Sequence, residues 1–272
     1  HRDLHSFPTR RSSDLPSHVV RPVLKRLESV GGYANAIVVS ASKGLEEDTQ
    51  LRISQIVLQE LPKLAPEQLA VLSGPSHAEE VSRRIPTAVV VASAQEKTAA
   101  FVQQILSGSF LRCYRSHDLV GVELGGALKN VIAIAAGICD GAGFGDNTKA
   151  ALQPRGLAEI ARLGKRMGAD LVTFAGLSGM GDLIVTCMSR HSRNRYLGEQ
   201  IGMGKTLTQV LASMTMVAEG VRTCKSAVQL ADKHDVEMPI CQQVYQILYQ
   251  DKDPKTALYE LMNREVKPEV WG

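Results

Sequence analysis

The stretch DLVGVELGGALKNVIAIAAGIC, residues 118–139, marks the point at which the pattern of the chain changes. Its apolar residues recur at spacings of three and four, which predicts a long helix. The same spacing returns downstream, with Gly or Pro between the segments, over residues 152–167, 220–234 and 240–249. The strand pattern does not return, so we expect residues 117–272 to form an all-helical domain.

Upstream of this stretch, short β-branched runs alternate with helical segments. The runs that predict strands cover residues 36–40, 70–72, 87–92 and 110–114. Residues 46–61 and 96–106 have the composition and spacing of helices. Such alternation is typical of an α/β layer with a largely parallel sheet, and we expect one over residues 16–116. Residues 1–15 lack apolar periodicity and are expected to be a non-native or disordered segment outside the fold.

The composition predicts a soluble globular protein. Of the 272 residues, 44% are apolar and 22% charged, and the net charge of +3 is spread along the chain, so we expect no nucleic-acid groove and no membrane-surface patch. The longest strongly apolar run, residues 131–139, is about half of the roughly 20 residues that an integral membrane span needs. Five cysteines without a C-x-x-C pair are interpreted as buried or inert thiols in the cytoplasm. The histidines are scattered, so we expect no metal site.

Lys129 is the first candidate for chemistry. Its neighbours in the predicted helix are nearly all small or apolar. Burial disfavours the charged form of a lysine and moves its pKa toward the range useful for proton exchange. The alternative is a lysine that snorkels from an amphipathic face. Gly125 and Gly126 favour a site, because two glycines inside a helix cost stability unless a backbone or ligand approaches closely.

A second group of candidates follows the glycines of residues 176–181. Asp182 begins a short predicted helix, where the helix dipole alone would explain an acid. Asp182 and Thr186 are four residues apart and share a helix face, so both could point into one cleft. Ser192, Arg193 and Asn194 combine hydroxyl, guanidinium and amide donors, which suit a phosphate ester, although a surface cluster is the alternative.

Two loops follow predicted strands. Lys43 lies in the first, and Gly74, Ser76 and Ala78 lie in the second, residues 72–78. The strand-end loops of an α/β sheet are where its ligands bind. Ordinary turn chemistry explains the Gly-Pro pair of the second loop equally well.

In this order, the motifs resemble the bacterial-type NAD(P)-dependent glycerol-3-phosphate dehydrogenase family. The resemblance runs from about Pro16 to near the C-terminus. The motifs that carry it are VSASKG at 39–44, LSGPSHA at 72–78, GGALKNV at 125–131, GAGFGDN at 141–147, GMGDL at 179–183, SRNR at 192–195 and VAEG at 217–220. It implies a partial Rossmann-like parallel sheet domain, the remaining part of a dinucleotide-binding domain over residues 16–116, followed by an all-helical C-terminal substrate domain.

The resemblance also implies an activity and its residues. The reaction would interconvert sn-glycerol 3-phosphate and dihydroxyacetone phosphate with NAD or NADP, in the cytoplasm, and supply phospholipid synthesis. Lys129 would be the catalytic acid/base. The other residues implied to bind or line the substrate are Lys43, Gly74, Ser76, Asn130, Asp182, Thr186, Ser192, Arg193 and Asn194. Those implied to contact the cofactor are Ala78, Arg193, Val217 and Glu219.

Two departures from the family pattern stand out. No Gly-rich strand-turn-helix fingerprint for the cofactor pyrophosphate precedes Pro16, so we expect the first part of the dinucleotide domain to be missing, and the choice between NAD and NADP stays open. Pro154 stands where the family has a threonine, and we expect it to alter the local start of a helix.

Two alternative functions remain open at this point. One is a related two-domain hydroxy-acid dehydrogenase, which would need a carboxylate clamp. The other is a non-catalytic helical interaction module, if the truncation is biological. For the dehydrogenase, the expected partner is a small phosphorylated triose, without nucleic acid or an integral membrane span, and a homodimer is one assembly that the sequence allows.

Overall fold

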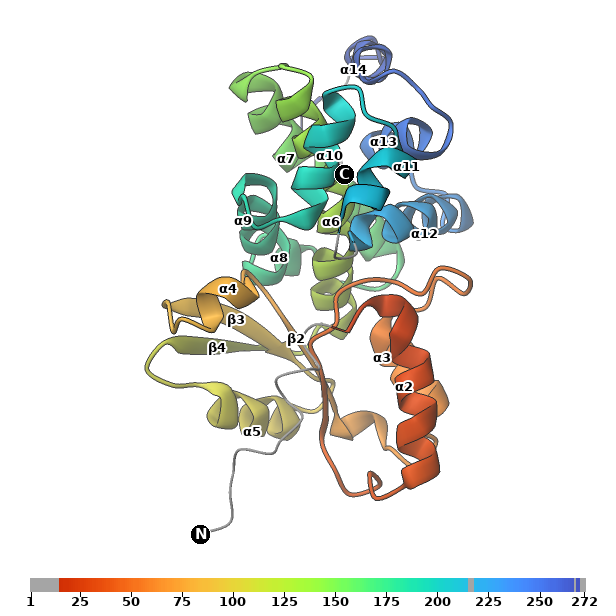
Figure 1. Cartoon of the computed structure of the whole chain (residues 1–272). Coiled ribbons are helices and arrows are strands. Elements are labelled where there is room, and N and C mark those ends of the chain that lie inside the picture. The colour runs from red at the N-terminus through yellow and green to blue at the C-terminus, as the bar shows by residue number, and fades with distance from the viewer. Residues whose placement is uncertain (1–14, 215–217, 267, 270–272) are drawn as a thin grey trace.

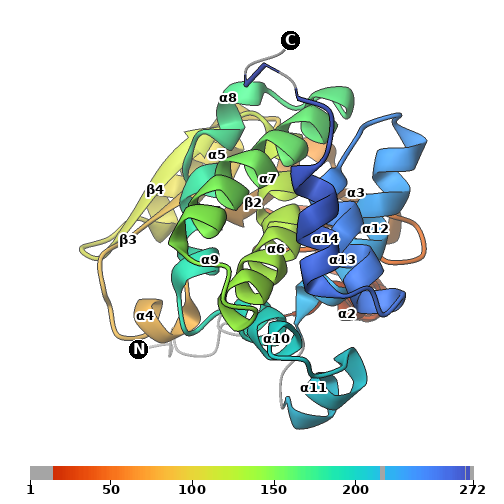
Figure 2. The same ribbon diagram turned by 90° about the horizontal axis from the view of Figure 1, so that it is seen from above.

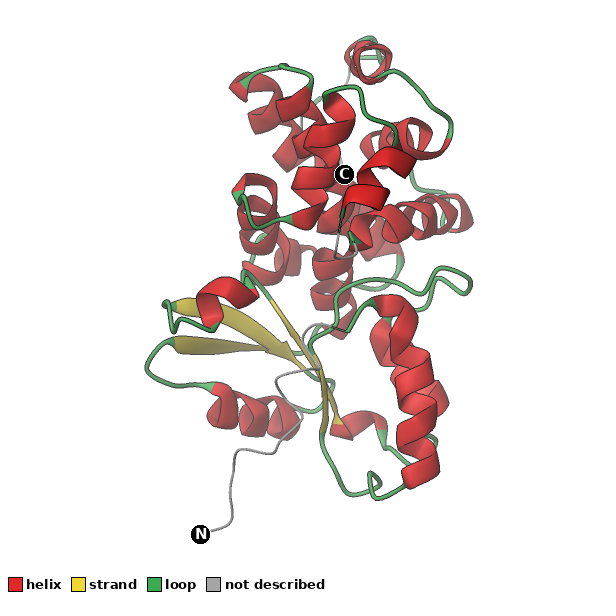
Figure 3. Ribbon diagram, in the orientation of Figure 1, coloured by secondary structure: helices red, strands yellow, loops and turns green. Residues whose placement is uncertain are grey.

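The computed structural model describes residues 15–214, 218–266, 268 and 269. The chain folds into two packed parts, a small sheet with helices around it and a larger bundle of helices (Figure 1). In the described residues, the strands lie together at one end of the molecule and the other end is built of helices (Figure 3). The long helix α6, Leu119–Gly141, leads from the sheet into the bundle. This architecture confirms the fold class expected from the sequence.

The sheet has four strands in the order β1-β2-β3-β4. They are β1 Val38–Ser40, β2 Leu69–Ser73, β3 Thr87–Ala92 and β4 Leu111–Ser116. The pairs β1–β2 and β3–β4 are parallel, as expected, but β2 and β3 are antiparallel, with Leu72 opposite Val91. The connection between β2 and β3 contains only the short helix α4, Ala78–Val81, so the chain turns back instead of crossing over the sheet. The sheet is therefore mixed.

Helices cover the sheet part on the outside. The described ones are α2 Ser17–Val30, α3 Ile53–Glu60, the 3-10 turn η1 Pro66–Gln68 and α5 Glu96–Leu106. The predicted helix 96–106 is confirmed at both ends. Helix α2 was not expected from the sequence. Its buried residues Val20 and Leu24 pack with Ile56 and Val57 of α3 in one apolar cluster, so a tertiary contact holds it in place.

The helix predicted over residues 46–61 is wrong in its first half. Residues 46–51 form a tight turn, closed by hydrogen bonds from Glu46 N to Leu51 O and from Gln50 N to Glu46 O, at 3.0 and 2.9 Å. Gln50 has a φ of 57°, in the left-handed region. Helix α3 begins only after Arg52, whose backbone N–H donates to the Gln55 side chain at 3.0 Å. We call residues 44–52 the strap.

The helical part is built around α6. Every residue from Gly121 to Cys139 is buried, which explains why this helix is apolar on all sides. Figure 2, which looks onto the helical part, shows α6 surrounded by other helices. They are α7 Asp146–Arg166, α9 Asp182–Met188, α10 Arg193–Gly202, α12 Glu219–Lys233 and α13 Pro239–Tyr249. The four helices predicted for this part are present, three of them within two residues at both ends, whereas α7 begins six residues before the predicted residue 152.

The bundle also contains shorter elements. They are α8 Leu171–Phe174, the π-helical turn η2 Leu177–Gly181, α11 Leu207–Ser213 and α14 Pro254–Met262. Pro154 lies inside α7, which already begins at Asp146, so the expectation that this proline alters the start of a helix is wrong. All five cysteines are free and buried, as expected.

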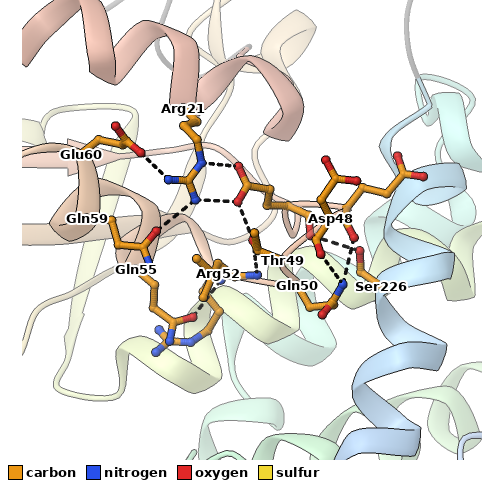
Figure 4. Close-up of polar contacts among 12 residues, drawn as sticks. Arg21, Asp48, Thr49, Gln50, Arg52, Gln55, Gln59, Glu60 and Ser226 are labelled. Atoms are coloured by element: carbon orange, nitrogen blue, oxygen red, sulfur yellow. Dashed lines mark hydrogen bonds and ion pairs between the residues drawn. The ribbon is translucent and has the colours of Figure 1, made fainter.

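The strap joins the two parts of the molecule. On one side, Arg21 of α2 donates hydrogen bonds from Nε and Nη2 to the Glu46 carboxylate at 2.8 and 2.6 Å. Its Nη1 pairs with Glu60 of α3. Figure 4 shows Arg21 between Gln59, Glu60 and the turn that carries Thr49 and Gln50. Leu45 is fully buried in the apolar core of the helical part.

On its other side, the strap contacts α12. Gln50 Nε2 donates to Gln229 Oε1 at 2.9 Å, and Lys225 Nζ pairs with Glu47 Oε1 at 3.0 Å. The strap begins one residue after Lys43. The position of Lys43 is therefore fixed by contacts to both parts.

Two segments of the described chain are long and apolar enough to cross a membrane by length and composition, α6 and Leu171–Met188. In the most apolar 18-residue stretch of α6, 89% of the residues are buried inside the protein. In the corresponding stretch of Leu171–Met188, 39% are buried. The apolar character of α6 is thus that of a core helix.

Candidate active site

Lys129 lies in the buried stretch of α6, with 5% of its surface exposed. Its ammonium donates to Thr186 Oγ1 at 2.6 Å and pairs with Asp182 Oδ1 at 2.9 Å. Burial lowers the pKa of Lys129 to about 8, and the Asp182 carboxylate opposes this shift only in part. The snorkelling alternative is wrong for this side chain. Lys129 is instead an enclosed amine that can change protonation state near neutral pH.

Asp182, the first residue of α9, lies between two lysines. Oδ1 faces Lys129, and Oδ2 accepts from Lys43 Nζ at 2.8 Å. Burial alone would raise the pKa of Asp182, but the two ammonium groups outweigh burial and hold the pKa below its usual range. The three charges sum to +1, so the cluster suits an anionic ligand.

Lys43 brings the strand-end loops to this cluster. Its ammonium also donates to the Gly74 carbonyl at 2.8 Å and lies 3.5 Å from Ser76 Oγ. Lys43 and Asp182 are 139 residues apart in the chain. The structure thus brings together six of the residues singled out in the sequence: Lys43, Gly74, Ser76, Lys129, Asp182 and Thr186.

The two glycines of α6 allow this close approach. A Cβ on Gly125 would lie 2.7 Å from the Ser178 carbonyl oxygen in η2. A Cβ on Gly126 would lie 2.6 Å from Ser73 Oγ at the end of β2. The sequence-based expectation that another segment approaches this glycine pair is confirmed.

Gly125→Ala is expected to destabilise the protein although alanine favours a helix. The added methyl must push the backbone of η2 away, and overpacking of this kind costs about 1–3 kcal/mol. Gly108→Ala is the matched control, because no atom of the described residues lies within 4 Å of its Cβ position. Urea unfolding of both variants measures the difference. Equal free energies of unfolding would contradict the close approach at Gly125.

Ser192, Arg193 and Asn194 form the start of α10. Ser192 Oγ caps the helix by accepting from Arg195 N at 3.2 Å, and the buried Asn194 Oδ1 accepts from Gly220 N at 2.8 Å. These two side chains therefore also have structural tasks. The Arg193 side chain is exposed and has no hydrogen-bond or ion-pair partner in the part of the chain that the structure describes. Its guanidinium is available to a ligand.

The remaining candidates lie around this cluster. Asn130 is buried beside Lys129 in α6, and Ala78 is exposed at the start of α4. Glu219 begins α12, and its Oε2 accepts from Ser17 Oγ at 2.8 Å. A Cβ on Gly44 would lie 3.0 Å from this Oε2, so Glu219 is close to the loop of Lys43. Val217 lies outside the described residues.

One residue near the cluster was missed at the sequence level. His77 stands in the quoted motif between Ser76 and Ala78, but it received no role. Its pKa is lowered by burial and then by the Lys129 ammonium, and it also interacts with the charges of Asp182 and Lys43. The only signal in the sequence was its place between two assigned neighbours.

Family models and known proteins are similar to this chain over most of its length. Family models of NAD-dependent glycerol-3-phosphate dehydrogenase match the chain, the N-terminal one over residues 13–99 and the C-terminal one over residues 118–259. The glycerol-3-phosphate dehydrogenase (NAD(P)+) of Chlorobium phaeobacteroides is 50% identical over 94% of this chain and 76% of its own length. That of a Geobacter species is 57% identical over 86% of this chain and 70% of its own length.

A solved structure supports the same assignment. The crystal structure of glycerol-3-phosphate dehydrogenase from Coxiella burnetii is similar with a TM-score of 0.86 and 38% identity, covering 92% of this chain and 75% of that chain. A structure of the Dunaliella salina enzyme shares the fold, with a TM-score of 0.82 and 24% identity over 93% of this chain and 45% of that chain. The chain therefore belongs to the NAD-dependent glycerol-3-phosphate dehydrogenase family.

Proposed function

We propose that this chain catalyses the NAD(P)-dependent interconversion of sn-glycerol 3-phosphate and dihydroxyacetone phosphate. The observation that carries the proposal is the buried Lys129, whose pKa of about 8 suits an acid/base and which Asp182 holds in place. The net positive charge of the cluster with Lys43 suits a phosphorylated substrate. The names of the relatives, all glycerol-3-phosphate dehydrogenases, support the same reaction.

In the reduction direction, the Lys129 ammonium donates a proton to the carbonyl oxygen of dihydroxyacetone phosphate. In the oxidation direction, the neutral amine takes the proton from the hydroxyl of glycerol 3-phosphate. Thr186 Oγ1 and Asp182 Oδ1 fix the direction of the amine from two sides. Asp182 also holds Lys43, so both cations keep their places while the proton moves.

The residues present fit a nicotinamide cofactor. Glu219 Oε1 is buried without a hydrogen-bond partner among the described residues, so it can accept from a cofactor hydroxyl or amide. The Arg193 guanidinium suits a phosphate group. When bound, the nicotinamide supplies or accepts the hydride. We propose that Ala78, Arg193, Val217 and Glu219 contact this cofactor.

The direct test follows NADH and NADPH oxidation in the presence of dihydroxyacetone phosphate. We expect turnover with this substrate and little with a panel of 2-oxo acids, because the cluster contains no carboxylate clamp among the residues identified. Preferential reduction of an oxo acid would contradict the proposal. Running both cofactors in parallel also decides the preference between NAD and NADP.

Arg193→Lys is expected to raise the KM for dihydroxyacetone phosphate by about tenfold, because an ammonium cannot reproduce the planar two-point contact of a guanidinium with phosphate. Steady-state kinetics with dihydroxyacetone, which lacks the phosphate, provides the comparison. An equal loss with both substrates would mean that Arg193 serves only the cofactor or the fold and does not bind the substrate phosphate. Arg190→Lys, in the turn that precedes α10, is the control.

The cellular setting is a further part of the proposal. We propose that the enzyme works in the cytoplasm, supplies glycerol 3-phosphate to phospholipid synthesis, and forms a homodimer. Cell fractionation and light scattering test the location and the assembly, and a purely monomeric active enzyme would overturn the last point.

A further inference from the structure

His77 has an unusual position in the loop between β2 and α4. It is the N-cap residue of α4, but its side chain does not cap the helix. Its Nε2 is buried and has no hydrogen-bond partner among the described residues. A buried polar atom without a partner costs free energy, so its presence beside a ligand site calls for a partner from the ligand.

The surroundings of His77 indicate where that partner lies. The imidazole interacts with the charges of Lys129, Asp182 and Lys43, and with Glu79 of α4. Its ring centroid lies 6.3 Å from that of His191, at an interplanar angle of 55°. His191 directly precedes Ser192. The His77 ring thus lies beside His191, next to the start of α10, and within range of the charges of the lysine cluster.

The chemistry of the imidazole fits an anion in this place. Burial, followed by the charge of Lys129, lowers the pKa of His77, so the ring is neutral near pH 7 and offers one N–H donor. The adjacent Lys43, Lys129 and Asp182 carry a net charge of +1. An N–H group in a positive environment binds a phosphate oxygen more strongly than a neutral acceptor.

We propose that Nε2 of His77 donates a hydrogen bond to the phosphate group of the bound substrate and makes His77 a determinant of the preference for phosphorylated trioses. This inference rests on the proposed function, because it requires a phosphate ester beside the cluster of Lys43, Lys129 and Asp182. It adds the loop after β2 to the phosphate contact proposed for Arg193.

The kinetic test uses two variants. His77→Phe keeps a planar ring without a donor, and His77→Gln keeps an N–H group near the position of Nε2. We expect His77→Phe to raise the KM for dihydroxyacetone phosphate about tenfold, with kcat within about threefold, and to leave kcat/KM for dihydroxyacetone unchanged. His77→Gln should recover a KM within about threefold of the parent.

Other outcomes overturn the inference. An unchanged KM in His77→Phe, or an equal loss with both substrates, means that His77 does not bind the phosphate. His234→Phe, at the C-terminal end of α12, is the matched control and should leave the KM for both substrates unchanged. Thermal unfolding of each variant identifies a loss that comes from the fold.

A binding measurement separates this inference from the proposed function. Inorganic phosphate is titrated into protein that carries 15N-labelled histidine, and the His77 imidazole resonances are followed. We expect them to shift and the pKa of His77 to rise, because a bound anion favours the protonated ring. If His77 responds but dihydroxyacetone phosphate is not reduced, the proposed function fails alone. If turnover is normal and His77 does not respond, the inference fails alone.

Discussion

Lys129→Met is expected to lower kcat for dihydroxyacetone phosphate reduction by about 10² or more, the usual contribution of a positioned proton donor. Methionine keeps most of the length and the apolar stem of lysine, so the buried stretch of α6 should stay packed. Asp182 retains one ammonium partner, Lys43, at 2.8 Å. Cofactor binding should change little, because Lys129 is not among the residues proposed to contact the cofactor.

The pH dependence of the parent enzyme provides a second check on Lys129. Reduction requires the ammonium, so its rate should fall as the pH rises through about 8. Oxidation requires the neutral amine, so its rate should rise over the same range. Initial rates in both directions between pH 6 and pH 10 measure these limbs. Parallel limbs in the two directions would exclude Lys129 as the group that exchanges the proton.

Lys205→Met is the matched control for this substitution. Lys205 is exposed in the turn between α10 and α11, where its ammonium contacts only the Gln200 side chain among the described residues. Its loss should leave kcat within about twofold of the parent value, because contacts of exposed lysines contribute little to the stability of the fold. If Lys129→Met also stays within a few-fold of the parent, Lys129 is a structural lysine and the mechanism is wrong.

The elements that the sequence predicted best are those whose residues are determined locally. Helix α6 is apolar on nearly all sides despite its glycines, and this pattern alone identifies it as a buried helix. Strand β3 is a β-branched run and begins and ends where predicted. Helix α2, in contrast, has apolar residues at helical spacing, but Pro22 interrupts the pattern. Its stability comes from packing against α3, which its own sequence does not reveal.

The strap shows how tertiary contacts override local preference. Residues 46–51 have helical composition, yet Leu45 is drawn into the core of the helical part and Arg21 fixes Glu46 from the opposite side. Both contacts come from distant parts of the chain. In the structure the chain makes both contacts through the turn of residues 46–51.

The sequence indicated which residue types belong to the candidate site, but it did not indicate how they are arranged in space. The Gly125-Gly126 pair indicated a close approach at α6, and the structure shows it at Ser178 and Ser73. The sequence did not indicate that one carboxylate, Asp182, pairs with both Lys43 and Lys129, because the three residues lie far apart in the chain. The antiparallel pairing of β2 with β3 likewise depends on the short connection through α4, which a strand pattern does not encode.

Asp182→Asn should be the most destabilising of the proposed substitutions. It leaves the ammonium of Lys129, 5% exposed, without its carboxylate, and breaking a buried ion pair by removing one partner costs about 3–5 kcal/mol. Asp140→Asn is the matched control. Asp140 also bridges two cations, Lys149 and Arg195, but its side chain is 20% exposed, so water compensates and the loss should be about 1 kcal/mol. Urea unfolding at pH 7 measures both.

The pH dependence of stability separates this charge effect from a simple loss of packing. The folded-state pKa of Asp182 lies below the ordinary 3.8, so its stabilisation is fully present above that value and is lost as the pH falls through the folded-state pKa. The pKa of Lys129 is instead lowered in the folded state, so stability rises with pH from about 8 toward the ordinary 10.5. Without Asp182 this pKa falls further, and the rise should begin at lower pH and be larger. If the free energy of unfolding of Asp182→Asn stays below that of the parent by a constant amount from pH 6 to pH 10, the substitution has removed only packing. An ammonium left without its carboxylate would instead regain stability when it loses its proton at high pH.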